Sequence, residues 1–145
     1  MEISIVNSYS QLAQCLAIRG KVFVEEQGVP KELEIDAYDD SPEACVHVLL
    51  TYQGIPAGTG RWISYNNQTA KIQRLSVLSE FRGKGVGKRL LQELENQAHI
   101  AANTYCILDS QLHAESFYKQ LGYLTVSKYP FEDAGIMHVR MQKAL

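Results

Sequence analysis

The sequence predicts a single domain of mixed α/β class (α+β), in which one β-sheet carries helices on its faces. The chain of 145 residues has the length of one domain, and its content of 46% hydrophobic and 21% charged residues is ordinary for a globular protein. Segments with strand and helix periodicity alternate along it. Because no repeat, low-complexity stretch or linker interrupts this pattern, we place one domain over residues 1–145.

The chain is expected to open with a strand and a helix. Residues 3–6 are rich in strand-forming side chains, and Ser8 or Ser10 can then cap a helix whose leucines repeat at helical spacing. Residues 25–43 are acidic and interrupted by Gly and Pro. We expect them to form a loop with at most one short helix.

Three antiparallel strands and a long helix are expected next. The turn signals Gln53-Gly54 and Asn66-Asn67 separate apolar runs, which predict strands at residues 45–52, 57–65 and 70–78. From Val86 apolar residues recur every four positions with charged residues between them, which predicts an amphipathic helix to about Ala101. The later elements are expected to be a strand at 105–108, a helix at 114–121 and strands at 123–126 and 137–141.

Composition excludes several classes of protein. The net charge of −2 argues against a dedicated nucleic-acid binder, and no stretch has the roughly 18 apolar residues of a membrane span. Neither a disulfide framework nor a metal site is indicated by the spacing of the cysteines and histidines, which are Cys15, Cys45, Cys106, His47, His99, His113 and His138. With no secretion signal at the amino terminus, we expect a cytoplasmic protein without a metal.

A glycine-rich basic turn precedes the long helix. It runs from Arg82 to Lys88 and places three glycines where unpaired N–H groups and the helix dipole favour an anion. A P-loop would need Ser or Thr in place of Arg89, and the glycine spacing does not fit a dinucleotide fingerprint. The turn therefore indicates a pyrophosphate site, although a flexible basic loop that opens a helix remains an alternative.

The motifs around this turn resemble the GNAT family of N-acetyltransferases, whose signature is Q/R-x-x-G-x-G/A. The resemblance rests on Leu75-Ser76-Val77, Phe81, the Arg-Gly-Lys-Gly-Val-Gly turn, Leu90-Leu91 and the later segment Phe117-Tyr118-Lys119-Gln120-Leu121-Gly122-Tyr123. The amino-terminal part is similar to a YjcF-like or ElaA-like bacterial subgroup through Arg19, residues 22–30, Glu34, Asp36 and His47. The resemblance implies a twisted mixed sheet that splays between its fourth and fifth strands, with helices on both faces and coenzyme A in the opening.

The same resemblance implies roles for particular residues. Acetyl-coenzyme A (acetyl-CoA) would be the co-substrate. Its pantetheine arm would lie along Leu75, Ser76 and Val77, and its pyrophosphate would lie on Arg82, Gly83, Lys84, Gly85, Val86, Gly87 and Lys88. Tyr118 matches the tyrosine that reaches the sulfur and is expected to give a proton to the thiolate, although its hydroxyl could merely orient the thiolate and a packing role is a further alternative. Gln111 is expected to touch the pantetheine, or to be a plain polar residue at a helix entry.

The general base is not evident from the sequence. Relatives often use a glutamate on the fourth strand, where this chain offers only Gln73. We expect Glu26 to take this role, with Glu34 or a water relay as alternatives. The acidic residues 25–43 would attract a cationic amine or form a solvated loop, and Arg19, Arg61 and Arg74 would line the acceptor site or pair with those carboxylates.

These observations predict an N-acetyltransferase that passes the acetyl group of acetyl-CoA to a primary amine by direct attack in a ternary complex. The amine would belong to a small molecule or a protein. Because a dedicated base is missing, a non-catalytic sensor of coenzyme A or acyl-CoA is the alternative function. Relatives of this kind often form homodimers, and neither nucleic acid nor a membrane is expected as a partner.

Overall fold

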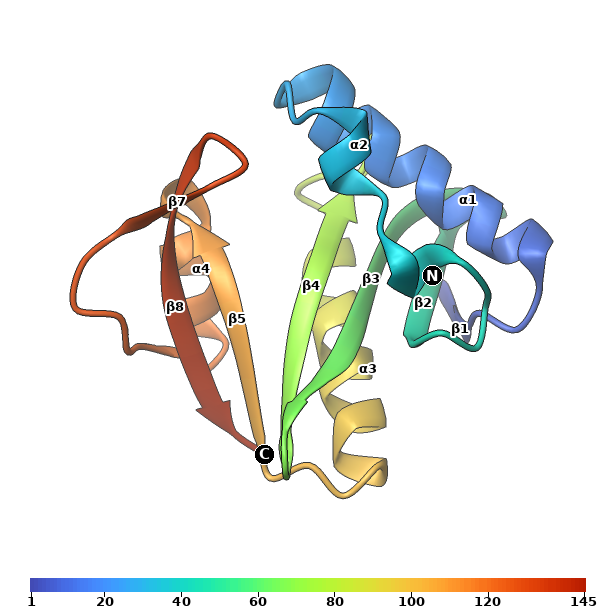
Figure 1. Ribbon diagram of the computed structural model, residues 1–145. Coiled ribbons are helices and arrows are strands. Elements are labelled where there is room, and N and C mark those ends of the chain that lie inside the picture. Colours follow the sequence, from blue (N-terminus) through green and yellow to red (C-terminus); the bar gives the residue numbers. More distant parts are fainter.

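The computed structural model describes residues 1–145 and consists of one eight-stranded sheet with helices on its two faces (Figure 1). Its elements in chain order are β1 (Glu2–Ile5), α1 (Tyr9–Arg19), the π-helix η1 (Gly20–Glu26), α2 (Lys31–Glu34), the 3₁₀ helix η2 (Ala37–Asp39), β2 (Val46–Tyr52), β3 (Ile55–Asn66), β4 (Thr69–Val77), the 3₁₀ helix η3 (Ser79–Phe81), α3 (Val86–Ile100), β5 (Tyr105–Gln111), the 3₁₀ helix η4 (Leu112–Ala114), α4 (Glu115–Gln120), β6 (Leu124–Thr125), β7 (Phe131–Asp133) and β8 (Ile136–Ala144). None of the helices has the length and apolar character needed to cross a lipid bilayer.

The amino-terminal helix is longer than the sequence indicated. Ser8 caps α1 as one of the two expected candidates, because its side chain accepts a hydrogen bond from the Gln11 N–H. The helix continues as η1 to Glu26, and α2 and η2 follow. Residues 25–43 therefore hold two short helical segments rather than at most one. Side-chain contacts between distant residues order this segment, and its local sequence does not show them.

The meander β2–β3–β4 is antiparallel, as predicted. A β-bulge interrupts the β3–β4 pair, where Gly60 of β3 faces two residues of β4, Arg74 and Leu75. Arg74 has a φ of +59°, in the left-handed region that side chains other than glycine rarely occupy. A Cβ added to Gly60 would lie 2.7 Å from Leu94 Cδ1, so glycine is needed here for α3 to pack closely on the sheet.

The sheet splays between β4 and β5. These two strands pair in parallel only from Thr69 to Ile72 and from Tyr105 to Leu108, and beyond those residues they diverge (Figure 1). On the far side, β8 pairs with β5, β6 and β7, all antiparallel. β7 was not predicted from the sequence, and β8 is longer than the strand predicted at residues 137–141. Polar residues in both strands hide the alternation of apolar and polar side chains.

Two clusters of buried side chains lie on opposite faces of the sheet. Val48 and Leu50 of β2 pack with α3 in the larger cluster, whereas Leu49 between them packs with α1 in the smaller one. This alternation follows from the two-residue period of a strand. It confirms the prediction of helices on both faces.

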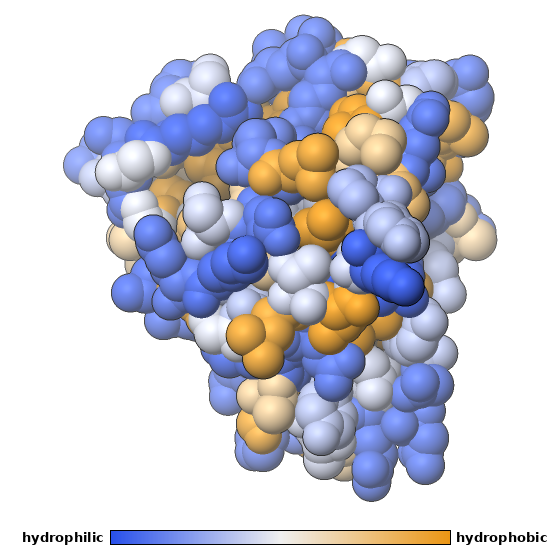
Figure 2. Space-filling view, turned by 90° about the vertical axis from the view of Figure 1, so that its left-hand side faces the viewer, coloured by the Kyte–Doolittle hydropathy of each residue, from blue (hydrophilic) through white to orange (hydrophobic).

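The end of the molecule that carries β7 and β8 exposes apolar side chains among polar ones (Figure 2). The exposed apolar residues of this region include Leu124, Val126, Tyr129 and Met137.

Candidate active site

A cleft of about 910 Å³ opens where β4 and β5 diverge. It is lined on one side by β4, η1 and the start of α3, and on the other by β5, α4 and the β7–β8 hairpin. Nearly all the residues expected to hold coenzyme A line this cleft, namely Leu75, Ser76, Val77, Arg82, Gly83, Gly85, Val86, Gly87, Lys88, Gln111 and Tyr118. Lys84 does not, since its ammonium lies over the Tyr52 ring, 5.7 Å from the centroid.

The glycine-rich turn presents a row of free backbone amides to the cleft. Gly83 and Gly85 have φ angles of +76° and +80°, which glycine adopts without strain. The Arg89 N–H is the first of α3 to reach a carbonyl, that of Gly85 at 3.1 Å, so the amides of residues 83–88 have no protein acceptor. No acidic residue lies in the first turn of α3. This geometry suits a phosphate group.

The end of β4 offers a second set of backbone groups. Leu78 donates its N–H to the Ala57 carbonyl of β3 at 2.9 Å. Because N–H groups alternate sides along a strand, the Val77 N–H points to the opposite edge, into the opening between β4 and β5. An extended ligand lying there can accept a hydrogen bond from it.

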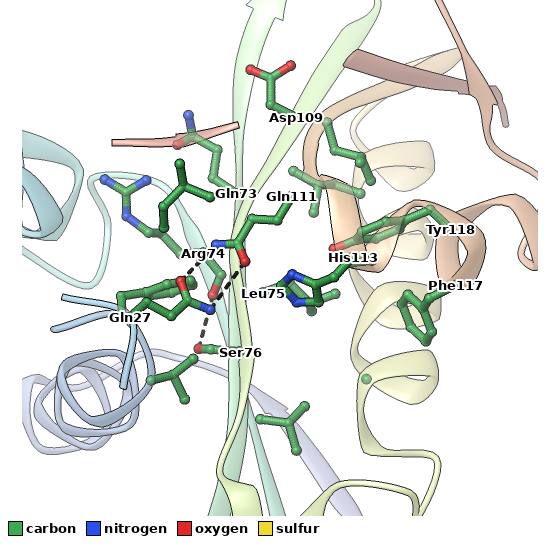
Figure 3. Close-up of a pocket in the computed structure, with 18 of the residues that line it drawn as sticks. Gln27, Gln73, Arg74, Leu75, Ser76, Asp109, Gln111, His113, Phe117 and Tyr118 are labelled. Carbon is green, nitrogen blue, oxygen red and sulfur yellow. Dashed lines mark hydrogen bonds between the residues drawn. The ribbon is translucent and has the colours of Figure 1, made fainter. Parts of the chain in front are cut away.

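Tyr118 on α4 points into the cleft from the opposite wall (Figure 3). Its ring makes edge-on contacts with Phe117 and Tyr123, with centroids 5.1 and 5.9 Å away. Its hydroxyl has no hydrogen-bond partner within the protein. Burial raises the pKa of Tyr118, so the phenol keeps its proton at neutral pH and can act as a donor.

An amide bridge crosses the cleft. Gln111, at the end of β5, donates to Gln27 Oε1 at 2.7 Å, and Gln27 Nε2 donates back to Gln111 Oε1 at 3.2 Å (Figure 3). Gln27 directly follows η1. In the view of Figure 3, Asp109 and Gln73 lie above the bridge and Ser76 lies below it.

Glu26 lines the cleft beside the glycine-rich turn, where Arg82 holds it. The guanidinium donates to both carboxylate oxygens, at 3.1 and 2.9 Å, and its Nε donates to the Val77 carbonyl at 3.0 Å. Both side chains of this ion pair are more than a third exposed, at 39% for Glu26 and 46% for Arg82. This ion pair engages both carboxylate oxygens of Glu26.

Much of the acidic cluster is neutralised by buried arginines. Arg19, only 1% exposed, donates to both carboxylate oxygens of Glu34 and of Asp39. Arg61 binds Asp39 at 2.8 Å and Asp36 at 2.7 Å. Burial alone would raise the pKa of Asp39, but hydrogen bonds from Arg19 and from the Asp36 N–H hold it well below its usual range. These carboxylates fasten the amino-terminal segment to the sheet.

Arg74 both lines the cleft and pairs with a carboxylate, the two roles that the sequence left open. It lines the cleft, and its Nε lies 2.8 Å from Glu34 Oε2. Its side chain also approaches the carbonyls of Leu33 and Glu34, at 3.4 and 3.2 Å. Arg74 therefore connects the bulge of β4 to the α2 segment.

Backbone carbonyls fix which ring nitrogen donates a hydrogen bond in two histidines. His138 lines the cleft and has Nδ1 2.7 Å from the Ile136 carbonyl, so Nδ1 carries the proton and Nε2 is free. His47 Nε2 lies 3.3 Å from Cys45 Sγ, but it donates to the Tyr38 carbonyl at 2.9 Å and cannot take the thiol proton. Burial raises the pKa of Cys45 to about 11, so this thiol is no nucleophile. No cluster of His, Cys, Asp or Glu is arranged to hold a metal ion.

The sequence indicated no role for Gln27 and no partner for His138. Antiparallel pairing places His138 opposite Gln111, and the turn of the chain after η1 brings Gln27 to the same place. Both partners lie far away in sequence. A single sequence holds no signal that would have revealed either contact.

Together the splayed sheet, the amide-rich turn and the half-buried phenol of Tyr118 are the features of an acyl-CoA N-acyltransferase. A family model described as an acetyltransferase (GNAT) domain matches residues 7–145. The chain is 36% identical over 143 residues to YjcF of Bacillus subtilis, an uncharacterised N-acetyltransferase, covering 99% of each protein. It belongs to the GNAT family and is an acyl-CoA-dependent acetyltransferase.

Solved structures agree with this assignment. ElaA of Escherichia coli is 26% identical and superimposes with a TM-score of 0.84 over 98% of each chain. An aminoglycoside 6′-N-acetyltransferase complexed with coenzyme A is 18% identical and has a TM-score of 0.77, covering 99% of this chain and 97% of its own. The latter likeness shows a shared fold.

Proposed function

We propose that the protein transfers the acetyl group of acetyl-CoA to a primary amine of a small molecule or a protein, by direct attack in a ternary complex. The observation that carries the proposal is the row of unpaired amides at residues 83–88 beside the cleft that ends at Tyr118. The neighbour with the same fold that was solved with coenzyme A supports this choice of co-substrate.

The residues of the cleft fit coenzyme A. The amides of residues 83–88 and the Lys88 ammonium would hold the pyrophosphate, and the free edge of β4 at Leu75, Ser76 and Val77 would hold the pantetheine. Gln111 would bind a pantetheine amide from the other wall. Bound acetyl-CoA supplies an activated acetyl group as a thioester, which the amine attacks as the C–S bond breaks.

The protein's own groups then serve the transfer of charge and protons. The Val77 N–H is placed to bind the carbonyl oxygen on which negative charge develops. The Tyr118 hydroxyl, which is protonated at neutral pH and points into the cleft, donates its proton to the departing sulfur. Glu26 accepts the amine proton once Arg82 has turned to the pyrophosphate.

The three cysteines are all free thiols, as expected in a reducing compartment, and we propose that the reaction takes place in the cytoplasm.

Release of free thiol from acetyl-CoA across a panel of amines tests the function. We expect turnover with at least one primary amine, and a fall in kcat of about 100-fold in Tyr118→Phe with an unchanged Kd for acetyl-CoA. Phe117→Leu is the matched control, because it changes the neighbouring ring without touching the hydroxyl. Binding of acetyl-CoA without thiol release from any amine would favour a sensor instead.

A further inference from the structure

Two consecutive residues at the end of η1 are each held by a residue assigned to the coenzyme. Arg82 of the glycine-rich turn holds Glu26, and Gln111 of β5 holds Gln27. Neither Glu26 nor Gln27 has another side-chain partner. We call this pair of contacts the latch.

The latch lies where the two walls of the cleft face each other. Its Gln27–Gln111 bridge provides the only side-chain hydrogen bonds between residues 1–43 and residues 105–145. Figure 3 shows the bridge in the middle of the cleft, which Ser76 of β4 also lines. An extended ligand between β4 and β5 would pass this point.

A bound coenzyme would compete for both halves of the latch. A pyrophosphate on residues 83–88 offers Arg82 charge-assisted hydrogen bonds, which rival those to an exposed carboxylate. A pantetheine amide beside Gln111 offers the same donor and acceptor groups as the Gln27 amide. The contacts to Glu26 and Gln27 can therefore both be exchanged for contacts to the coenzyme without leaving Arg82 or Gln111 unpaired.

The segment that carries the latch has an irregular backbone. η1 is a π-helix, a form that occurs mostly as short irregular stretches and often at functional sites. Gly28 follows at once with a φ of +73°. The Glu26 side chain, 39% exposed, can turn away from Arg82 by rotation about its own bonds, without disturbing the buried arginine network.

We propose that Glu26 and Gln27 form one edge of the acceptor site and that the latch keeps them occupied until acyl-CoA binds. The inference rests on the proposed function. Once released, the Glu26 carboxylate and the Gln27 carbonyl both accept hydrogen bonds, which suits an acceptor with several N–H donors, a primary ammonium group. The ammonium proton passes to Glu26 and from this exposed carboxylate to water, so the neutral amine keeps its lone pair for attack. Glu26 then takes the second proton, which the nitrogen loses once the C–N bond has formed.

Calorimetric titration with coenzyme A tests the latch without an acceptor. Because the coenzyme must break the latch, Glu26→Gln and Gln27→Ala should bind coenzyme A more tightly than the parent protein, each by about 2- to 10-fold. Gln111→Ala should not bind coenzyme A more tightly, because it removes both the latch and a contact to the coenzyme.

Glu25→Gln is the matched control for charge. Glu25 is exposed, has no ion pair and lies in the same segment, so this variant removes one negative charge near an anionic ligand and leaves Arg82 untouched. The latch is overturned if Glu26→Gln gains no more affinity for coenzyme A than Glu25→Gln does and Gln27→Ala gains none. Failure of the parent protein to bind coenzyme A would instead overturn the proposed function.

The side-chain amide signals in a ¹⁵N NMR spectrum give an independent readout. Saturation with coenzyme A should move the Gln27 NH₂ signal toward the position that it has in ligand-free Gln111→Ala. If the backbone signals of residues 83–88 shift while the Gln27 signal stays in place, the bridge survives binding and the inference is wrong.

Discussion

Arg74 illustrates how a single residue can be held in an unfavourable backbone conformation by its contacts. Its φ of +59° lies in the left-handed region, which costs a residue with a Cβ about 1–2 kcal/mol. The β-bulge opposite Gly60 requires this conformation, and ion pairs to Glu34 and Asp36 at 2.8 and 3.6 Å offset its cost. The result is a guanidinium between the cleft and the α2 segment.

This strain predicts an inverted order of stability at position 74. Arg74→Ala and Arg74→Gly lose the same ion pairs, but only glycine relieves the backbone strain. We expect Arg74→Gly to be more stable in urea unfolding by about 1 kcal/mol, although glycine in a strand is usually about 0.5–1 kcal/mol less stable than alanine. Lys71, in the same strand with an ordinary φ, supplies the control pair Lys71→Ala and Lys71→Gly. The usual order at both positions would show that position 74 is unstrained.

At the scale of the element, buried charges order the segment from α2 to η2. Arg19 and Arg61 reach this segment from α1 and β3, and Asp39 of η2 binds both. Asp39 also accepts the Asp36 N–H at 3.0 Å and so closes a capping box around η2. Removing one member would leave charges buried without their partner, which typically costs 3–5 kcal/mol.

We therefore expect Asp39→Asn to unfold about 3 kcal/mol more easily than the parent protein at pH 7. The folded state lowers the pKa of Asp39 below its unfolded value of about 3.9, so the carboxylate stabilises the fold above that pH. The contribution declines as pH falls through the unfolded pKa of about 3.9 and is lost once pH falls below the lower pKa of the folded state. Urea unfolding at pH 7 and pH 3.5 should thus show a smaller difference in unfolding free energy between variant and parent at the lower pH.

Asp40→Asn, on an exposed residue without an ion pair, is the control. An equal difference at both pH values would contradict the assigned role of the charge.

At the scale of the whole molecule, the two halves of the sheet share little backbone pairing. β4 and β5 are paired through only four residues each before they diverge. Ion pairs and hydrogen bonds add to this junction, such as Lys71–Asp109 at 3.2 Å and Lys143–Glu95 at 3.1 Å. A ligand in the cleft would contact both halves at once.

Acetyl-CoA should therefore stabilise the whole molecule against heat. At about 100 times its Kd a ligand adds about 2.7 kcal/mol, which corresponds to a rise in Tm of roughly 5–10 °C for a domain of this size. Differential scanning calorimetry with and without acetyl-CoA measures the shift, with ATP at the same concentration as a control for anions. A Tm unchanged by millimolar acetyl-CoA would contradict the assigned cleft.

Local patterns in the sequence determined the class of the fold, the meander, the helix α3 and the glycine-rich turn. Each depends on residues that are neighbours in the chain, such as the glycines at 83 and 85 that allow a left-handed backbone. The resemblance of the motifs to the GNAT family added the splay and the coenzyme residues. Strand and helix periodicities, turn residues and caps act over a few residues, and one sequence displays them in full.

The tertiary structure alone decided which charges are free and which are paired. Carboxylates that looked able to attract an amine proved to be held by Arg19, Arg61 and Arg74, and Gln27 met Gln111 across 84 positions of sequence. Such contacts depend on how the two halves of the sheet diverge and where η1 ends. Side chains distant along the chain meet only after packing has fixed their relative positions, so no local pattern in this sequence contains them.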